Sequence, residues 1–265
     1  MSLTLIPIYL LIGCASGFFA GLLGIGGGII LVPALLLAFG LEGFPPQFIF
    51  QAALGTSMAT ILFTAVASLR SHHRHNSVMW PVVRSFTPGV LAGTALGTLI
   101  ARHVPTAGLT AFFALFLILV AAQMGLGFRA KAGRVLPGSF GVALVGVGIG
   151  VVSALAAVGG GAMTVPFLSW CNCDIRKAIG TAAAVGFPIA VGGTLGYVIN
   201  GWTAGGLPEG SLGFVYLPAL VWTVLAGALM APLGARATSV LPALVLRRIF
   251  AVLLIIVAAQ LLTGL

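Results

Sequence analysis

Two clusters of three glycines are the residues of this sequence best suited to bind a ligand. The clusters are Gly26, Gly27 and Gly28, and Gly159, Gly160 and Gly161. Glycine lets the backbone adopt positive φ and approach a ligand closely. A helix that begins directly after such a cluster points N–H groups and the positive end of its dipole at an anion. We expect the two helix N-termini to form one anion site. No Gly-Lys-Ser/Thr follows either cluster, which excludes a nucleotide-binding P-loop.

Hydroxyl and amide side chains in the apolar segments are the next candidates. Thr56 and Ser57 follow Gly55, and Thr181 follows Gly180 in a similar stretch. Hydroxyl groups donate hydrogen bonds to an oxyanion without adding a buried charge, although buried Ser and Thr also bond to their own helix. Two copies of Val-Ala-Ala-Gln end in Gln123 and Gln260. An amide in an apolar segment needs a partner or a cavity, so these two residues either contact substrate or join helices.

The positions of the ionisable residues exclude several kinds of chemistry. We expect all three acids, Glu42, Asp174 and Glu209, to lie in loops. A coupled ion would then need backbone carbonyls, His or the substrate's own protons. All four His also fall in loops, which argues against an intramembrane serine protease and against an enzyme in general. The three Cys form no second pair, and no His cluster completes a zinc site. We predict neither a metal nor a cofactor.

The composition predicts an integral membrane protein. Of the 265 residues, 60% are hydrophobic and only 6% are charged, whereas about 25% are charged in soluble domains. We attribute the net charge of +9 to basic loops that set membrane topology. No basic run is interleaved with exposed aromatic residues, so nucleic acid is not expected as a partner. The expected partners are the lipid bilayer and a small anion.

Hydropathy divides the chain into ten apolar segments, two of which are too short to cross a bilayer comfortably. The segments are 3–23, 25–39, 47–69, 81–101, 106–127, 138–157, 159–170, 178–199, 212–233 and 242–263. The two short ones, 25–39 and 159–170, each begin at a glycine cluster. We predict an all-α membrane protein with roughly 8 to 10 membrane segments. Each short segment is either a short span or part of a re-entrant hairpin.

An internal repeat predicts the domain organisation. Val-Leu-Ala-Gly and Val-Ala-Ala-Gln each occur twice in the same order, and two longer stretches also recur: 17–36 resembles 150–169, and 52–59 resembles 177–184. We divide the chain into a first transmembrane repeat (1–128), a basic cytoplasmic linker (129–137) and a second transmembrane repeat (138–265).

The basic residues indicate whether the repeats are parallel or inverted. If each repeat crosses the membrane an odd number of times, eleven of the twelve Lys and Arg residues fall on one side, and only Arg102 falls on the other. Such a bias is typical of short loops that face the cytoplasm. We therefore predict inverted repeats in a bacterial inner membrane, with both termini on the periplasmic side.

The doubled glycine motif resembles the TauE/SafE sulfite exporter family. The resemblance rests on GLLGIGGGIILVPAL in the first repeat, VGGGAMTVPFL in the second and a paired Ala-X-Gly-Thr element, and it spans nearly the whole chain. It implies a multi-spanning inner-membrane permease for sulfur anions such as sulfite, thiosulfate and sulfoacetate. It assigns the site to Gly26, Gly27, Gly28, Thr56, Ser57, Gly159, Gly160, Gly161 and Thr181. Because Ser57 is matched by Ala182, and Gly24 by Ala157, we expect the first repeat to supply more donors.

Together these features predict a secondary transporter, expected to be an exporter, for sulfite or a related sulfur oxyanion or organosulfonate. Inverted repeats with broken helices are typical of transporters that work by alternating access. The alternative, from another class, is a passive channel for small anions. A transporter would saturate and show counterflow, whereas a channel would do neither.

Overall fold

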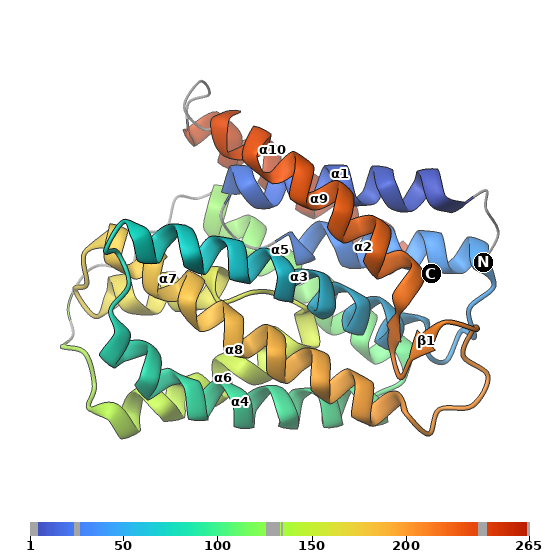
Figure 1. The fold of residues 1–265 in the computed structure, drawn as a ribbon, viewed down its shortest axis with the longest axis horizontal. Helices are drawn as coiled ribbons and strands as arrows, with labels where there is room; N and C mark the ends of the chain where they lie inside the picture. Colours follow the sequence, from blue (N-terminus) through green and yellow to red (C-terminus); the bar gives the residue numbers. More distant parts are fainter. Residues whose placement is uncertain (1–4, 24–26, 126–132, 134, 238–242, 264–265) are drawn as a thin grey trace.

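The computed structural model describes residues 5–23, 27–125, 133, 135–237 and 243–263. These residues form ten helices, most of which run roughly along the long axis of the molecule, and one small β-hairpin (Figure 1). The helices are α1 (Ile6–Leu23), α2 (Gly28–Glu42), α3 (Ile49–Arg74), α4 (Trp80–His103), α5 (Thr106–Gly125), α6 (Ser139–Ala156), α7 (Gly161–Trp170), α8 (Ile175–Gly201), α9 (Leu217–Ala237) and α10 (Ala243–Thr263). The antiparallel strands are β1 (Ser211–Leu212) and β2 (Val215–Tyr216), and β2 leads directly into α9.

Length and apolar composition place this bundle in a membrane. Among the described residues, five helical stretches are long and apolar enough to span a bilayer: α3, α5, α6, α8 and Leu217–Gly234 of α9. Large apolar side chains cover the outside of the bundle; Phe140 is 84% exposed and Leu229 is 77% exposed. Soluble monomers rarely expose so many. The chain is an all-α integral membrane protein.

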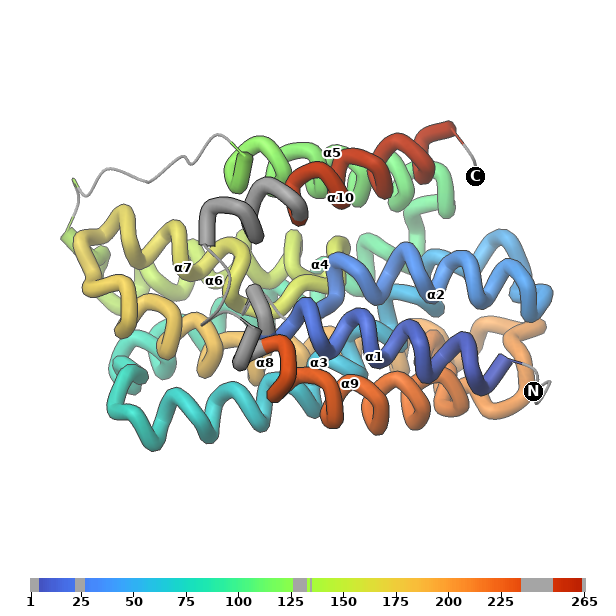
Figure 2. The backbone as a smooth tube through the Cα atoms, turned by 90° about the horizontal axis from the view of Figure 1, so that it is seen from above, coloured from blue at the N-terminus to red at the C-terminus, as the bar shows by residue number. Residues whose placement is uncertain are grey.

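The two short apolar segments belong to hairpins that enter the bundle from opposite ends. Tyr9, near the start of α1, donates a hydrogen bond to Glu42 at the end of α2, so both outer ends of this hairpin lie together. The hairpin of α6 and α7 enters from the other end (Figures 1 and 2). α7 has ten residues and is therefore about 15 Å long, half the thickness of the hydrocarbon layer. α7 alone is therefore too short to cross the bilayer.

Each hairpin is followed by three helices of 20 to 27 residues. The first hairpin precedes α3, α4 and α5, and the second precedes α8, α9 and α10. The start of α1 and the end of α10 lie at the same end of the molecule in both views (Figures 1 and 2). The two halves therefore run in opposite directions along the bundle axis.

Helices from the two halves pack against each other in equivalent pairs. α1 packs against α9, and α6 packs against α4. Gly17 on α1 meets Gly227 on α9, and Gly150 on α6 meets Gly93 on α4, each without room for a Cβ atom. Small residues allow this close approach of helices in lipid. Because Gly17 aligns with Gly150, and Gly227 with Gly93, the two contacts are copies of one another.

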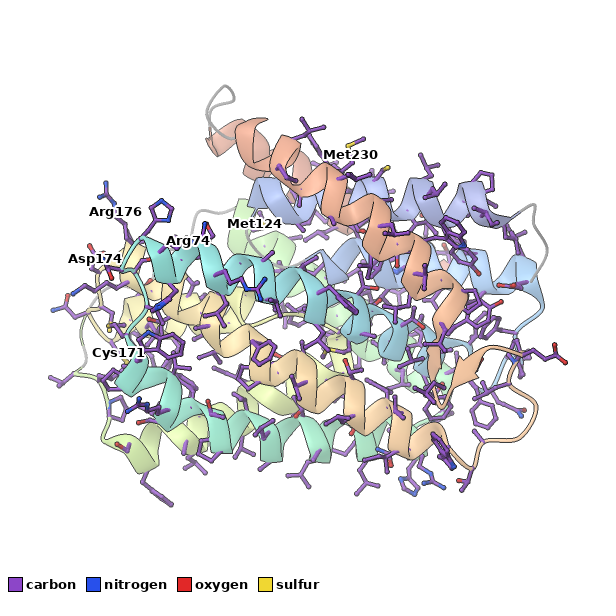
Figure 3. The ribbon with its side chains drawn as sticks, in the orientation of Figure 1. Arg74, Met124, Cys171, Asp174, Arg176 and Met230 are labelled. Carbon is purple, nitrogen blue, oxygen red and sulfur yellow. The ribbon has the colours of Figure 1, made fainter. Side chains whose placement is uncertain are left out.

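The charged residues at one end of the bundle include Arg74, Asp174 and Arg176, which Figure 3 shows opposite the start of α1. Asp174 caps α8 by accepting hydrogen bonds from the N–H groups of Arg176 and Lys177. The expectation that all three acids lie in loops is wrong for Glu42, which is the last residue of α2. Gly43, with a φ of 76°, ends the helix only after it.

Candidate functional site

The tip of the first hairpin has backbone geometry that favours glycine. Gly27 has a φ of 45°, in the left-handed region, and α2 begins at Gly28. The carbonyl of Gly27 accepts hydrogen bonds from the N–H groups of Ile30 and Leu31, at 3.1 and 3.0 Å. α2 thus begins directly after Gly27, and the N-terminus of that helix lies at the tip. Gly26 lies outside the described residues.

The tip of the second hairpin has its left-handed residue at a different position, at the end of α6. Ala157 has a φ of 45°, which costs a non-glycine residue about 1–2 kcal/mol, and α7 begins at Gly161. Gly160 lies against the backbone of Ala182 and Gly186 on α8, where a Cβ would overlap both. This tip is therefore packed tightly against its own half.

The two hairpin tips touch each other. A Cβ added to Gly28 would overlap the carbonyl oxygen of Ala157, so the start of α2 lies directly on the turn of the other hairpin. Gly159 and Gly160 are buried beside this contact. The structure thus brings together the described glycines of the two clusters.

A small cavity lies beside the first tip. Its walls come from α1, α2, α3 and α9, and its free volume is about 10 Å³, which suits about one water molecule. The residues around it include four hydroxyl residues and two glycines, although its surface is almost wholly apolar: Ser16, Gly27, Gly28, Thr60, Thr64 and Thr223. The N-terminus of α2 is thus close to hydroxyl residues from both halves of the chain.

Sequence reasoning missed these four hydroxyl residues, although one signal was readable. Thr56, Thr60 and Thr64 are spaced by four residues, so they share one face of α3. Thr60 and Thr223 place their hydroxyl oxygens 3.3 Å apart across α3 and α9. Each of the four hydroxyls donates to a carbonyl of its own helix, at 2.7 to 3.2 Å. To contact an anion, each must turn away from that carbonyl.

The predicted Thr56 and Thr181 join the two halves in the same way. The backbone N–H of Tyr216, the residue before α9, donates to Thr56 Oγ1 at 3.0 Å. The backbone N–H of Met79, the residue before α4, donates to Thr181 Oγ1, also at 3.0 Å. In each case the preceding glycine, Gly55 or Gly180, lets the facing backbone come close. These two hydroxyls hold the entry of a helix from the opposite half.

The other predicted side chains fall into two groups. Ser57 is fully buried, and its hydroxyl has no hydrogen-bond partner among the described residues. It lies one turn before Ile61, which lines the cavity, but Ser57 is not itself one of the lining residues. Gln123 on α5 and Gln260 on α10 are exposed on the outside of the bundle. The structure does not bring these two amides to the cavity.

Ionisable side chains could also bind a metal ion. Within the part of the chain that the structure describes, no three His, Cys, Asp or Glu residues are grouped to hold a metal ion. Cys171 and Cys173 lie in the turn between α7 and α8, at the basic end of the bundle (Figure 3). Burial raises the pKa of the Cys173 thiol, which favours its protonated form at neutral pH.

Two hairpins that enter a helical bundle from opposite ends and meet at their tips are features of a membrane transporter. Comparison with known proteins agrees. The chain matches the sulfite exporter TauE/SafE family over residues 9–261, and it belongs to that family. The fold therefore comes from a family of transporters rather than from a family of enzymes.

The curated relatives include proteins that match almost the whole chain. A protein of Haemophilus influenzae named "probable membrane transporter protein" is 34% identical over 260 residues, covering 96% of this chain and 97% of its own length. The "probable membrane transporter protein YdhB" of Bacillus subtilis is 26% identical and covers 87% and 89%. A relative in Methanocaldococcus jannaschii, of the same description, is 26% identical and covers 74% and 73%. No solved structure matches the chain.

Proposed function

We propose that this protein is a secondary transporter that exports sulfite, or a related sulfur oxyanion or organosulfonate, across the inner membrane by alternating access. The contact of the two hairpin tips beside the hydroxyl-lined cavity carries the proposal. The start of α2 offers backbone N–H groups and a dipole that favour an anion. Ser57 adds a buried hydroxyl without a partner, and an anion would satisfy it.

The geometry favours a transporter over a passive channel. A sulfur oxyanion is larger than the water-sized cavity, and the backbone contact between Gly28 and Ala157 leaves no gap between the tips. Substrate can enter only if the tips separate. A protein that must move for each substrate saturates at high concentration, as carriers do and open pores do not.

Among the predicted site residues, the described geometry supports different roles. Gly27 and Gly28 border the cavity, with Gly26 as their neighbour in sequence, and Ser57 is a buried donor one helical turn before Ile61, which also lines it. Gly159, Gly160 and Gly161 shape the opposite tip. Thr56 and Thr181 position the helices, and Gln123 and Gln260 face outward. We add Thr60 and Thr223 as the hydroxyls that turn towards the substrate.

The charge pattern supports an orientation. We place the end with Arg74 and Arg176 in the cytoplasm, because basic loops are retained there, and both termini in the periplasm. Cysteine residues added at each terminus should react with a membrane-impermeant maleimide in intact spheroplasts. A C-terminus that reacts only after lysis would contradict this orientation.

The function is tested with purified protein in proteoliposomes. Radiolabelled sulfite and sulfoacetate should enter with saturable kinetics, and unlabelled substrate on the opposite side should drive counterflow. Equal movement of chloride or phosphate would remove the sulfur assignment. Flux without saturation or counterflow would identify a passive channel instead.

A further inference from the structure

Four aromatic rings, which we call the aromatic layer, pack together at the outer end of the bundle, where α1 begins and α2 ends. They belong to Tyr9 on α1, Phe39 on α2, Phe44 just after α2 and Tyr216 on β2. Phe39 and Phe44 stack with their ring centroids 4.2 Å apart, and both meet Tyr216 edge-on, at 5.7 and 5.1 Å. Each of the four side chains is at most 4% exposed. The rings therefore leave no open path between them.

The aromatic layer and the cavity beside the first tip are built from the same helices. On α1, Tyr9 lies about two turns before Ser16, and on α2, Phe39 lies about two turns after Leu31. α1 runs inward from the outer end, whereas α2 runs outward from the tip (Figures 1 and 2). Both steps lead from the cavity towards the outer end. The aromatic layer thus covers the outer side of the cavity.

Tyr216 attaches the layer to α9 and α3, the other two helices that line the cavity. It directly precedes α9, about two turns before Thr223 of the lining. Its backbone N–H donates to Thr56 Oγ1 on α3 at 3.0 Å, and Thr56 lies one turn outward from Thr60 of the lining. An anion in the cavity can leave towards the outer end only if these rings separate.

A carboxyl group holds Tyr216 in the layer. Tyr216 donates its hydroxyl to Oε1 of Glu42 at 2.6 Å, and Tyr9 donates to Oε2 of the same group. Since Glu42 is the last residue of α2, one side chain ties β2 to both helices of the first hairpin. The Tyr216 ring is 1% exposed, so its hydroxyl loses its partner when the layer opens, which costs free energy.

The described residues of the other half provide no such tie at the opposite end. Met79, whose N–H binds Thr181, is the counterpart of Tyr216, and Val142 is the counterpart of Tyr9 in the aligned repeat. Neither side chain has a hydroxyl group. α7 has ten residues and α2 has 15, so α7 also lacks the last turn, which carries the carboxyl group in α2. The two ends of the bundle are therefore closed differently.

We propose that the aromatic layer is the outer gate of the transporter, and that Glu42 is the latch that holds Tyr216 in place until this gate opens. The proposal rests on the transport function proposed above and adds the side from which the cavity is first reached. Because the latch acts at the outer end alone, the inner end opens more readily, and substrate enters from the cytoplasm. An exporter needs this order, since it takes up its substrate there.

The gate is tested by the reaction of a thiol in the cavity with a membrane-impermeant thiosulfonate. Ser16→Cys places this thiol in the lining, in a chain whose three native cysteines are replaced by alanine. Spheroplasts present the outer end to the reagent, inside-out vesicles present the inner end, and labelling after denaturation gives the total thiol. With the latch intact, the thiol should react faster in the vesicles than in the spheroplasts.

The latch is tested by variants that keep the aromatic layer. Tyr216→Phe removes only the hydroxyl that Glu42 holds, so the thiol should react about tenfold faster in spheroplasts, as expected for one lost hydrogen bond, and at an unchanged rate in vesicles. Glu42→Gln should act in the same direction, because its amide has one acceptor oxygen for two phenols. Tyr197→Phe is the matched control. Its buried hydroxyl donates to Ala154 on α6, outside the layer, so both rates should stay unchanged.

Three results would overturn the proposal. An unchanged rate in spheroplasts for both Tyr216→Phe and Glu42→Gln would mean that these hydrogen bonds hold nothing closed. Equal increases from both sides would indicate a general loosening of the bundle. A thiol that reacts faster from the outside with the latch intact would contradict the order of opening. No substrate is used, so the labelling decides the gate even if proteoliposomes move no sulfur anion, a result that would remove the transport function alone.

Discussion

The two glycine hairpins have similar sequences but different surroundings. In the second, Gly160 is pressed against the backbone of α8, with no space between. In the first, Gly27 and Gly28 border a cavity that reaches α3 and α9. Two copies of one motif thus give a tightly packed tip and a tip with room beside it.

The aligned positions explain this difference. The hydroxyl residues of the cavity are Ser16, Thr60, Thr64 and Thr223, and their counterparts in the other half are Ile149, Val185, Ile189 and Gly89. An apolar branched side chain fills space and offers no donor. The comparison teaches that the hairpin occurs in both halves, whereas the cavity with hydroxyl residues around it lies beside the first tip. The sequence already pointed to this asymmetry through Ser57 and its counterpart Ala182.

The largest expected effect comes from separating the tips. In Gly28→Ala, the new Cβ would overlap the carbonyl of Ala157, and we expect transport to fall about 100-fold, as for other misplaced sites. Initial rates in proteoliposomes measure this. Gly40→Ala is the matched control in the same helix, because nothing lies within 4 Å of its Cβ position. Equal loss in both variants would mean that the contact of the tips is unimportant.

Removing cavity hydroxyls should have the next largest effect. Thr60→Val or Thr223→Val removes a hydroxyl donor from the cavity beside the first tip, and each should raise the KM for sulfite about tenfold, which corresponds to one hydrogen bond to a charged group. Concentration dependence of uptake gives the KM. Thr110→Val on α5 is the control, since its hydroxyl bonds only to its own helix. Should Val185→Thr in the second half lower the KM, the site would not belong to the first half alone.

Substitutions of Thr56 and Thr181 test the helix contact that both halves have in common. Thr56→Val and Thr181→Val each leave a backbone N–H without its acceptor, from Tyr216 and Met79 respectively. We expect both to lose about 1 kcal/mol of stability and to keep the wild-type KM. Thermal unfolding of the purified variants, with Thr→Ser at each position as the control, measures the loss. A change of KM in Thr56→Val alone would make Thr56 a substrate ligand.

The smallest effect is expected at the outward amides. Gln123→Leu and Gln260→Leu change side chains that are exposed on α5 and α10, so transport should change less than about twofold. Uptake rates of the two single variants and the double variant check this. A large loss of uptake would place these residues at a binding surface and extend the site beyond the cavity.

Much of the fold could be predicted because it depends on local properties of the chain. Hydropathy located the helices to within a few residues, and the internal repeat identified Gly17 and Gly150 as equivalent positions. The spacing of Thr56, Thr60 and Thr64 is also readable from the sequence. It is not part of the repeated motifs, because the other half has no matching hydroxyl residues at the last two positions. Glu42 was misplaced for a different reason: Gly43 and two prolines follow it closely, and they indicate a loop.

By itself, the sequence determined that this chain lies in a membrane, that its two halves are copies and that its basic residues gather in one set of loops. Those properties follow from composition and order, which need no knowledge of distant contacts. Only the tertiary structure decided that the tips touch, that one half keeps a cavity and that Glu42 binds two tyrosines. Tyr9 and Tyr216 lie 33 and 174 residues away from Glu42 along the chain. No local pattern can bring such groups together, because their contact exists only after the helices have packed.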